Sequence, residues 1–574
     1  MDIPQFTLEN YENDFADRHL LQGVIARWAK ERPAAPALVS AESGRTVTWS
    51  EFDRSTAAMA AQLLRLGFAK GDFLVTLLPM SIDHVLLEYS CFKIGAIVAP
   101  LDLRLSLAEV IRALQTLRPR SFAGLGIKGP LDLRPLWREV QGQCGWIEQL
   151  IAVDSEAEIP GTRSLASIAE AASTHANDES SAAKIAEVSV TENDGALVIF
   201  TTGSTGSPKP ALLSHRNITV QNMCVCGAFF GGDRGSRILV NLPASHVGGQ
   251  TEALMSILFG GGTAVLLEIF DAGRSMRAIA QHQVEILGQI PAMYNLEWML
   301  KDYDRHDLGS LKFAAYGGNA VSRAFVDQLA AMSPIIGTGL GLTESAGFCT
   351  YIHAGADGRE AIVAGLGQDM PVYPCTIRQP MRADGYAGEE LPAREIGHVC
   401  FLGPQTFLGY VKDPEATART ISRDGLLYTG DLGYKDGAGL HLTGREKWVI
   451  KSMGYQIFPG DVEQHIFGLG EKVANCVVVG VAHQVVSEAP VAVVEKRPQV
   501  ELTPQELDRH ARGLSSYMRP RHWIIIDPGQ MPLNRVGKPD YLRAQEMARQ
   551  EIAVLRARGE WDSGYDKGGA TKSE

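Results

Sequence analysis

The residues whose types and spacing are best suited to chemistry lie in segment 200–215, which reads FTTGSTGSPKPALLSH. An apolar run at 196–200 has the length of a buried strand and leads into this turn-forming segment. Such a loop can turn its backbone N–H groups and hydroxyls onto a polyphosphate, with Lys209 as a mobile positive charge. The spacing is neither Walker A nor GxGxxG. A flexible surface loop is the alternative, but the ordered string of polar turn residues favours a nucleotide-phosphate loop.

This loop resembles the phosphate loop of the adenylate-forming superfamily, which includes acyl- and aryl-CoA synthetases, peptide-synthetase adenylation domains and beetle luciferases. Those enzymes make an acyl-AMP from a carboxylic acid and ATP, and most then pass the acyl group to a thiol. The resemblance implies that ATP or AMP is bound by Thr201, Thr202, Gly203, Ser204, Thr205, Gly206 and Lys209. It also implies a catalytic role for Thr205. The superfamily usually has glycine where Pro210 stands; proline fixes one φ and removes an N–H donor, so we expect weaker phosphate binding.

A second cluster, residues 241–249, carries a histidine beside an expected acid pocket. In the resemblance, His246 takes the place of a gating histidine or aromatic residue of CoA ligases, with a catalytic role. The expected pocket residues are His246, Val247, Gly248 and Met293. Peptide-synthetase domains typically use a nearby aspartate to pair with the α-amino group of the substrate, and none is found here, which disfavours a free amino acid. A lone histidine is more often structural, so its place in the motif carries this prediction.

Glycine-rich turns at 315–319 and 337–344 form a third cluster, where a planar base could approach the backbone. The resemblance implies nucleotide contacts from Gly317, Gly318, Asn319, Gly339, Leu340 and Thr343. Glu344 is a hard oxygen ligand suited to Mg²⁺, and we expect it to be both the metal ligand and a catalytic residue. The superfamily commonly has an aromatic residue at the position of Leu340. Its loss is expected to remove adenine stacking of ~1–3 kcal/mol, by analogy with base–aromatic stacking.

A fourth cluster, Tyr428 to Asp431, matches the superfamily motif whose aspartate accepts hydrogen bonds from both ribose hydroxyls. A carboxylate suits this role because two donors on adjacent carbons need two acceptor oxygens. Arg445 is expected to reach the ribose or phosphate. The alternative interpretation is an ordinary β-hairpin around 437–439, but the full string of motif residues favours the nucleotide site.

The C-terminal motifs imply a moving lid. Lys447 occupies the hinge position of the superfamily, with Trp448 in place of the usual polar or acidic residue. Lys451 and Gly454 are expected on the CoA side, where a side chain at 454 would block thiol entry. Lys538 resembles the catalytic lysine whose ammonium bridges the carboxylate oxygen and the α-phosphate. A lysine near a C-terminus is more often solvated, and its register with the other motifs favours the catalytic interpretation.

Composition narrows the class of protein. A chain of 574 residues is too long for one core, so two or more domains are expected. A formal charge of −12 offers no basic surface for nucleic acid or an anionic membrane. The eight cysteines are scattered, which favours buried free thiols over a metal site. The polar, acidic N-terminus and the lack of an 18-residue apolar run predict no signal peptide, no membrane span and a cytoplasmic protein.

The pattern of elements predicts an α/β fold with a mostly parallel sheet. A helix is expected at 49–66, strands at 73–78 and 95–101, and a helix capped by Ser106 and Glu109. The buried stripe of that last helix is Leu107, Val110, Ile111, Leu114 and Leu117. Segment 154–194 is expected to hold peripheral helices and loops. The resemblance implies a large N-terminal domain, a small mobile C-terminal α+β lid domain and a disordered tail, at 1–443, 444–560 and 561–574.

The resemblance spans residues 47–542 with five motifs in superfamily order. It implies an AMP-forming acyl-CoA synthetase that uses ATP, Mg²⁺ and coenzyme A. The acid is expected to be hydrophobic: aromatic, alicyclic or medium-chain. Two alternatives stay open: a relative specialised for thioester formation that receives a preformed acyl-adenylate, and a non-catalytic nucleotide-binding relative. The oligomeric state is not predicted, because the sequence shows no coiled-coil signal or surface patch.

Overall fold

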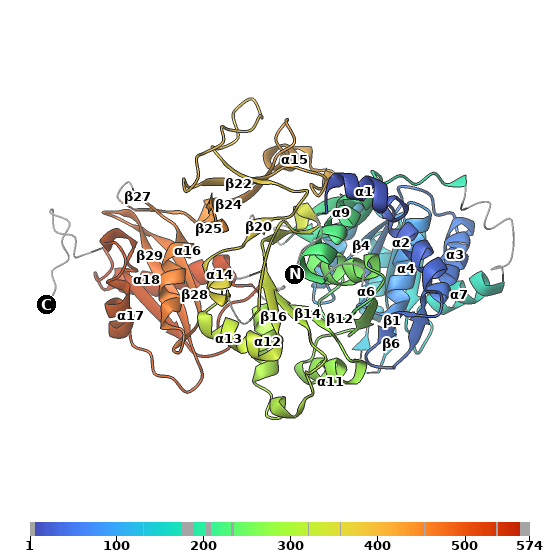
Figure 1. Cartoon of the computed structure of the whole chain (residues 1–574), viewed down its shortest axis with the longest axis horizontal. Helices are drawn as coiled ribbons and strands as arrows, with labels where there is room; N and C mark the ends of the chain where they lie inside the picture. Colours follow the sequence, from blue (N-terminus) through green and yellow to red (C-terminus); the bar gives the residue numbers. More distant parts are fainter. Residues whose placement is uncertain are drawn as a thin grey trace.

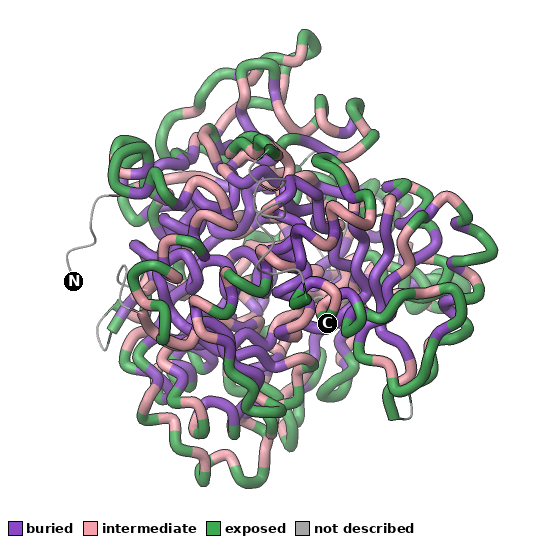
Figure 2. The backbone as a smooth tube through the Cα atoms, turned by 90° about the vertical axis from the view of Figure 1, so that its right-hand side faces the viewer, coloured by how far each residue is buried: buried purple, intermediate pink, exposed green. Residues whose placement is uncertain are grey.

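A computed structural model of the chain shows two bodies (Figure 1). The larger runs from the N-terminus to β25 (Gly439–Arg445), and the smaller, orange to red, begins at β26 (Ile450–Ser452). The structure describes residues 6–129, 131–174, 185, 187–201, 208–230, 235–318, 321–355, 358–452, 455–534 and 538–562. Buried backbone runs through the interior, and exposed segments lie at the periphery (Figure 2).

The first sheet of the large body has the strand order β23-β11-β10-β4-β3-β5-β8-β9. The strands from β10 to β9 in this order are parallel, whereas β11 is antiparallel to β10 and to β23. The strands are β3 (Phe73–Leu77), β4 (Ile97–Pro100), β5 (Ser121–Leu125), β8 (Gln149–Val153), β9 (Arg163–Ser164), β10 (Gly195–Thr201), β11 (Lys209–Ser214) and β23 (Gly409–Tyr410). The strands predicted at 73–78, 95–101 and 196–200 are confirmed as β3, β4 and β10.

The second sheet has the order β2-β1-β13-β12-β14-β15-β16-β19-β20. From β1 to β16 the strands are parallel, and β2, β19 and β20 pair antiparallel with their neighbours. The strands are β1 (Pro36–Ser40), β2 (Thr46–Thr48), β12 (Arg237–Val240), β13 (Thr263–Leu266), β14 (Ile286–Gln289), β15 (Phe313–Tyr316), β16 (Ile335–Thr338), β19 (Thr350–Ala354) and β20 (Gln368–Asp369). The predicted mostly parallel α/β architecture is confirmed.

Helices pack against both sheets. They are α1 (Leu8–Asp14), α2 (Leu21–Glu31), α3 (Trp49–Arg65), α4 (Ile82–Lys93), α5 (Leu107–Leu117), α6 (Arg134–Gln143), α7 (Leu165–Thr174), α9 (His215–Val225), α10 (Ser256–Phe259), α11 (Ala272–His282), α12 (Pro291–Trp298), α13 (Arg323–Met332), α14 (Arg359–Ala364) and α15 (Pro414–Thr420). One hydrophobic core joins the two sheets, since it contains Leu74 and Val98 of the first and Ile238 and Ala264 of the second. Helices α4 and α9 contribute to this core and are buried on nearly every face, as expected for helices without a solvent side.

A third, antiparallel sheet lies at the top of Figure 1 and has the order β21-β22-β24-β25. Besides β25, its strands are β21 (Cys375–Arg378), β22 (Gly397–Phe401) and β24 (Leu427–Asp436). Strands β24 and β25 do form a hairpin around Gly437, as the alternative interpretation held. Asp431 and Arg445 are paired at the open end of that hairpin, so the hairpin is also the scaffold of the motif.

The small body is an α+β unit around the strand order β27-β26-β29-β28, with β30 parallel to β29. Its other elements are β27 (Tyr455–Ile457), β28 (Val473–His483), β29 (Ser487–Lys496), β30 (His522–Ile526), α16 (Pro459–Ile466), α17 (Pro504–Ala511) and α18 (Tyr541–Ala557). One core holds Val462 of α16 and Leu507 of α17, and another holds Ala544 of α18. Helices therefore cover the sheet on both faces.

Three predictions need correction or refinement. The capping box of Ser106 and Glu109 is present, but Leu107 is 40% exposed because the first turn of α5 projects beyond the core. Trp561, placed in the disordered tail, is only 2% exposed and donates from Nε1 to the carbonyl of Ala482 at 3.0 Å. The tail residues 563–574 lie outside the described part. The predicted boundary between 443 and 444 falls inside β25 rather than after it.

All eight cysteines are buried, and none forms a disulfide. Within the described residues, no cluster of three or more His, Cys, Asp or Glu side chains is arranged to hold a metal ion. In the same part of the chain, no helix is both long enough and apolar enough to span a lipid bilayer.

Candidate functional site

A cavity of about 580 Å³ takes its walls from both bodies. Most of the predicted site residues that the structure describes line it: Thr201, Lys209, His246, Val247, Gly248, Gly317, Gly318, Gly339, Thr343, Glu344, Arg445, Lys447 and Lys538. These residues come from loops at strand ends of both large sheets, from the β24–β25 hairpin and from the loop before α18. Motifs that are far apart in sequence therefore meet in one place.

The predicted phosphate loop joins β10 to β11. Thr201 and Lys209 are paired across these strands, and the N–H of Lys209 donates to Oγ1 of Thr201 at 3.4 Å. Pro210 lies opposite Phe200 in β11, and its carbonyl accepts the N–H of Val411 at 2.8 Å, so the proline sits in the sheet beyond the loop. Thr202, Gly203, Ser204, Thr205 and Gly206 lie outside the described residues.

Lys209 and Glu344 meet around an aromatic ring that the sequence did not indicate. Nζ of Lys209 lies 5.1 Å from the ring centroid of Tyr410, at cation–π distance. The Tyr410 hydroxyl donates to Oε1 of Glu344 at 2.6 Å. Through this hydrogen bond, Tyr410 orients the Glu344 carboxylate on the same ring that Lys209 contacts. A single carboxylate beside a phosphate-binding loop fits Mg²⁺, which usually takes one or two protein ligands together with phosphate oxygens and water.

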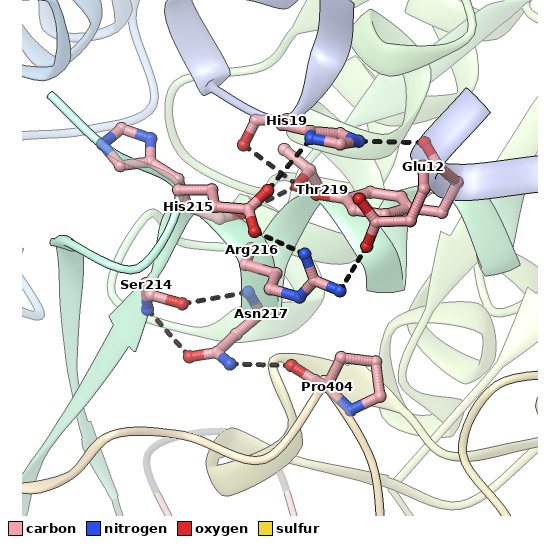
Figure 3. A network of polar contacts seen from close by, with 10 residues as sticks. Glu12, His19, Ser214, His215, Arg216, Asn217, Thr219 and Pro404 are labelled. Atoms are coloured by element: carbon pink, nitrogen blue, oxygen red, sulfur yellow. Dashed lines mark hydrogen bonds and ion pairs between the residues drawn. The ribbon is translucent and has the colours of Figure 1, made fainter. Parts of the chain in front are cut away.

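A polar network anchors the far end of β11 (Figure 3). Ser214 caps α9 by accepting the N–H of Asn217, and Asn217 donates from Nδ2 to the carbonyl of Pro404 at 2.8 Å. Arg216 forms an ion pair with Glu12 of α1 at 2.6 Å. The network fixes β11 between the N-terminal segment and the loop before β23, and so fixes the strand from which Lys209 projects.

Asp431 and Arg445 form an ion pair with Nε 2.8 Å from Oδ1. The carboxylate is 5% exposed, and its other oxygen, Oδ2, is buried without a hydrogen-bond partner among the described residues. An unpaired buried acceptor is costly, and a hydroxyl donor from a ligand would satisfy it. This orphan acceptor fits the ribose of a nucleotide.

Lys538 extends from the small body into the cavity. Asn534 braces its loop, because the Lys538 N–H donates to Oδ1 of Asn534 at 3.0 Å and its carbonyl accepts the Asn534 N–H at 2.7 Å. A Cβ on Gly318 would lie 2.7 Å from Cε of Lys538, so the close approach requires glycine there. Burial lowers the pKa of Lys538, Arg445 lowers it further, and the carboxylates Glu252 and Asp431 oppose this.

His246 lines the cavity as a neutral imidazole. Burial is the main cause that lowers its pKa to about 3, and the nearby charge of Lys538 acts in the same direction. Its Nδ1 accepts the N–H of Gly248 at 3.0 Å. The ring proton must therefore be on Nε2, which leaves His246 able to donate a hydrogen bond.

The acid side of the cavity is walled by aromatic rings. Phe229 packs edge to face on Phe348 with ring centroids 5.0 Å apart, and lies 5.6 Å from Phe313. Phe229 belongs to the π-helical segment η2 (Cys226–Phe230), and a second π-helical segment, η3 (Gly248–Met255), forms the neighbouring wall. Such segments occur often at functional sites. The sequence pattern gave no sign of either.

Glu252 of η3 also lines the cavity, and sequence reasoning missed it. The peptide-synthetase pattern has an aspartate close to the position of His246, whereas this carboxylate is a glutamate farther along the segment. The sequence did contain one signal for this residue, because Glu252 is the single charged side chain in the run 247–255. Its burial raises the pKa to about 7, while the charge of Lys538 opposes that shift.

Several predicted residues are not at the cavity. Leu340 is 9% exposed within the large core, and Met293 of α12 is 6% exposed; neither is among the lining residues. The Leu340 side chain packs in the large core. Its N–H donates to Oγ1 of Thr350 at 2.9 Å, between β16 and the short pair β17 (Gly341–Leu342) and β18 (Gly347–Phe348). Lys451 is exposed outside the cavity. Asp431 is not among the lining residues either, although the adjacent Gly430 and its ion-pair partner Arg445 are. Asn319 and Gly454 fall outside the described residues.

The predicted hinge is packed against the loop that carries Lys538. Nζ of Lys447 lies 4.5 Å from the ring of Trp448, and Trp448 stacks on Tyr541 with centroids 5.4 Å apart. Tyr541 donates its hydroxyl to Glu463 of α16 at 2.6 Å. Burial lowers the pKa of Lys447 to about 8, and Arg445 contributes to that shift. The unusual tryptophan thus links the hinge to the first residue of α18.

Family comparison agrees with this geometry. Residues 25–411 match the model of the AMP-binding enzyme family, and residues 461–538 match the model of the C-terminal domain of AMP-binding enzymes. The chain belongs to this family. The adenylate-forming superfamily predicted from the motifs is therefore confirmed, and the curated relatives fall in its CoA ligase branch.

Two curated relatives illustrate that branch. The chain is 27% identical over 499 residues to 4-coumarate–CoA ligase 2 of Oryza sativa subsp. japonica, which covers 83% of this chain and 84% of the relative. It is 28% identical over 518 residues to a feruloyl-CoA synthase of Amycolatopsis sp., which covers 89% of this chain and 96% of the relative.

Solved structures share the fold. The amide bond synthetase McbA of Marinactinospora thermotolerans superposes with a TM-score of 0.76 at 22% identity, covering 92% of this chain and all of that one (100%). ATP-bound MatB of Rhodopseudomonas palustris also gives a TM-score of 0.76 at 22% identity, over 92% of this chain and 99% of its own.

Proposed function

We propose that the protein is an AMP-forming carboxylic acid:CoA ligase. It activates a hydrophobic acid with ATP as an acyl-AMP and then transfers the acyl group to the CoA thiol. The observation that carries this proposal is the entry of Lys538 into the cavity that is also lined by His246 and by Arg445, the ion-pair partner of Asp431. The curated relatives, which are CoA ligases, support the same class of reaction.

In the first half-reaction, a carboxylate oxygen of the acid attacks the α-phosphorus of ATP, and pyrophosphate leaves with the electrons of the α–β bridging bond. The Lys538 ammonium is placed to offset the negative charge that gathers on the α-phosphate and the attacking oxygen. Asp431 binds the ribose through its unpaired oxygen, and Lys209 contacts the phosphates together with Thr201. Glu344 would hold Mg²⁺, which would offset phosphate charge.

In the second half-reaction, the CoA sulfur attacks the acyl carbonyl, AMP leaves from that carbon, and the thiol proton is released. The lid would rotate about Lys447, withdraw Lys538 and bring Lys451 and Gly454 to the CoA side. Weak contacts between the bodies support this motion: Arg497 donates to Ser322 at 3.3 Å, and Gln464 donates to the carbonyl of Val363 at 3.5 Å. Contacts of this strength, among the residues that the structure describes, would oppose such a rotation only weakly.

The walls of the cavity support one class of acid. Phe229, Phe313 and Phe348 offer flat apolar surfaces, which favour an aromatic acid over the alicyclic and medium-chain acids that the sequence left open. Neutral His246 can donate from Nε2 to the acid carboxylate or to the developing acyl oxygen. The small residue Gly248 leaves room beside it.

Acid-dependent ATP–pyrophosphate exchange tests the proposal, with a panel of aromatic, alicyclic and medium-chain acids. Exchange with an acid, followed by its conversion to a CoA thioester, is the expected result. The absence of both activities across the panel would contradict the proposal. A non-catalytic nucleotide-binding relative would bind ATP and give neither product.

A ligase limited to thioester formation is the second candidate, and Leu340 favours it. This side chain packs into the core, so it leaves adenine without an aromatic shelf at that position. Such an enzyme would be silent in exchange yet would form thioester from synthetic acyl-AMP and CoA. Exchange restored by Leu340→Tyr with Pro210→Gly would identify these two positions as the cause.

A further inference from the structure

A carboxylate that the proposed reaction does not use lines the acid side of the cavity. Glu252 lies on η3, and it borders the same space as His246 and Phe348. Its side chain sits deep in the protein but keeps accessible surface, and as a lining residue it presents that surface to the cavity. A carboxylate removed from bulk water is costly to keep ionised without a partner. Its presence in a wall of phenyl rings therefore calls for a ligand group that offsets the cost.

Glycines from separate segments leave room for this carboxylate. A Cβ on Gly347 would lie 2.6 Å from Cγ of Glu252, and a Cβ on Gly341 would lie 2.9 Å from Oε1. A Cβ on Gly248 would lie 3.5 Å from Oε2. Any larger residue at 341 or 347 would displace the carboxylate, so the short β17–β18 pair is built around Glu252.

The two oxygens of Glu252 have different surroundings. Oε1 is on the side of β17 and β18, where the backbone of Phe348 lies close by and favours the ionised form of the carboxylate. On the same side, Nε2 of Gln221 is buried without a partner, 2.7 Å from the point that a Cβ on Gly347 would take. Oε2 is on the side of Gly248, toward His246 and the cavity.

No cation of the protein neutralises Glu252 at short range. Among the residues that the structure describes, no Lys, Arg or His nitrogen forms an ion pair with it within 4.0 Å. Lys538 acts on it only through a longer-range charge interaction, and Lys538 is the group that the adenylation step uses. The positive partner of Oε2 is therefore not supplied by the chain itself.

We propose that Glu252 selects an aromatic carboxylic acid whose acyl part carries a nitrogen-borne hydrogen-bond donor, with a protonated amine as the best match. The inference rests on the proposed function, since it names the acid activated at the same site. The ring of the acid packs against the wall formed by Phe229 and Phe348, and its nitrogen donates to Oε2 of Glu252. An alkyl group at that place leaves the carboxylate desolvated and unpaired, which gives discrimination against apolar acids.

A matched pair of acids tests this inference: aminomethylbenzoate and the isosteric ethylbenzoate, at each ring position. The ratio of kcat/KM values in pyrophosphate exchange is measured for the wild type, Glu252→Gln and Glu88→Gln. Glu88 is the control because it is also buried, with its pKa raised to about 8 and a 2.7 Å bond from Gln250, but it does not line the cavity. The affinities of the two aroyl-sulfamoyl adenosines are measured in parallel, which needs no turnover.

We expect the wild type to prefer the amine by at least ~10-fold at one ring position, as for a hydrogen bond to a charged group, and Glu252→Gln to abolish that preference. Glu88→Gln should keep it. Equal ratios in the wild type and Glu252→Gln, or failure of both analogues to bind, would overturn the inference. If no pyrophosphate exchange is seen but the amine-bearing sulfamoyl adenosine still binds more tightly than its ethyl counterpart, the proposed function fails and the inference about Glu252 stands. Turnover of both acids without an amine preference would support the proposed function and overturn the inference about Glu252.

Discussion

Asp431 and Arg445 face each other across the β24–β25 hairpin, and their ion pair occupies only one oxygen of the carboxylate. The other oxygen is buried without a partner in the described part of the chain. The guanidinium orients the carboxylate, so the position of its second oxygen is fixed. An unpaired buried acceptor is costly, and a hydroxyl group of the ribose in the proposed nucleotide would satisfy it.

Asp431→Asn should weaken ATP binding because an amide offers one acceptor oxygen where the carboxylate offers two. We expect the KM for ATP to rise by about 10- to 100-fold, which corresponds to the loss of a hydrogen bond to a charged group. The ATP dependence of exchange measures this. Asp384→Asn, at a side chain that is 58% exposed, is the control and should leave KM at its wild-type value. A variant at 431 with wild-type KM would exclude the ribose role.

Lys538→Ala should separate the two half-reactions. Adenylation is expected to fall by about 10²- to 10³-fold, the usual loss when one preorganised charge-stabilising group is removed. Thioester formation from synthetic acyl-AMP and CoA should persist, because the proposed mechanism withdraws Lys538 in that step. Lys496→Ala, which removes a lysine paired with Asp527 of the small body, is the control. Equal losses in both half-reactions would show that Lys538 serves structure rather than adenylation.

The pH dependence of exchange should report the surroundings of Lys538. Burial, followed by Arg445, lowers its pKa below the ordinary value of 10.5, although Glu252 and Asp431 counteract this. The protonated form is the active one, so activity is present below the folded-state pKa and is lost as pH rises through it. We expect kcat/KM to decline on the alkaline side before pH 10.5. Lys538→Arg should move the decline upward, since a guanidinium stays charged, and a profile identical to wild type would contradict the assignment.

The residues proposed to bind the nucleotide could be recognised in the sequence because phosphate and ribose chemistry restrict the residue types. Lys209, Glu344, Arg445 and Lys538 were each singled out, and the structure brings them to one cavity. Strand predictions succeeded where apolar runs were short and bounded by turn residues, as in β3 and β10. These signals are local, so tertiary packing did not override them.

The acid side could not be predicted in the same way. Phe229 and Glu252 lie on π-helical segments, and a π turn shifts which residues face the cavity relative to an α-helix. Leu340 shows the opposite failure, since its motif position is clear but its side chain points into the core. Side-chain direction at a strand end depends on neighbouring pairing, here between β17 and β18. That pairing is not visible in residue spacing.

Trp561 should stabilise the small body although it was expected in the tail. It is 2% exposed, stands edge to face with His483, and donates to the carbonyl of Ala482. Trp561→Ala is expected to lower the free energy of unfolding of this body by ~3–5 kcal/mol, as for other buried aromatic residues. Thermal unfolding and hydrogen exchange measure the loss. Deletion of 563–574, which spares the tryptophan, is the control; equal effects of both changes would rule out the packing role.

Trp448 should hold the lid in the arrangement that presents Lys538. It stacks on Tyr541, which begins the helix that follows Lys538, and it carries the Lys447 ammonium on its ring. Trp448→Ala removes an aromatic contact of about 0.5–1.5 kcal/mol, so adenylation should slow by about 2- to 12-fold. The transfer of a preformed acyl-AMP to CoA should not slow, because the same contact opposes rotation of the lid. Trp448→Phe retains a ring and should retain most of the exchange activity. Parallel losses in exchange and transfer would instead mean that Trp448 supports the fold of the hinge and does not bias its position.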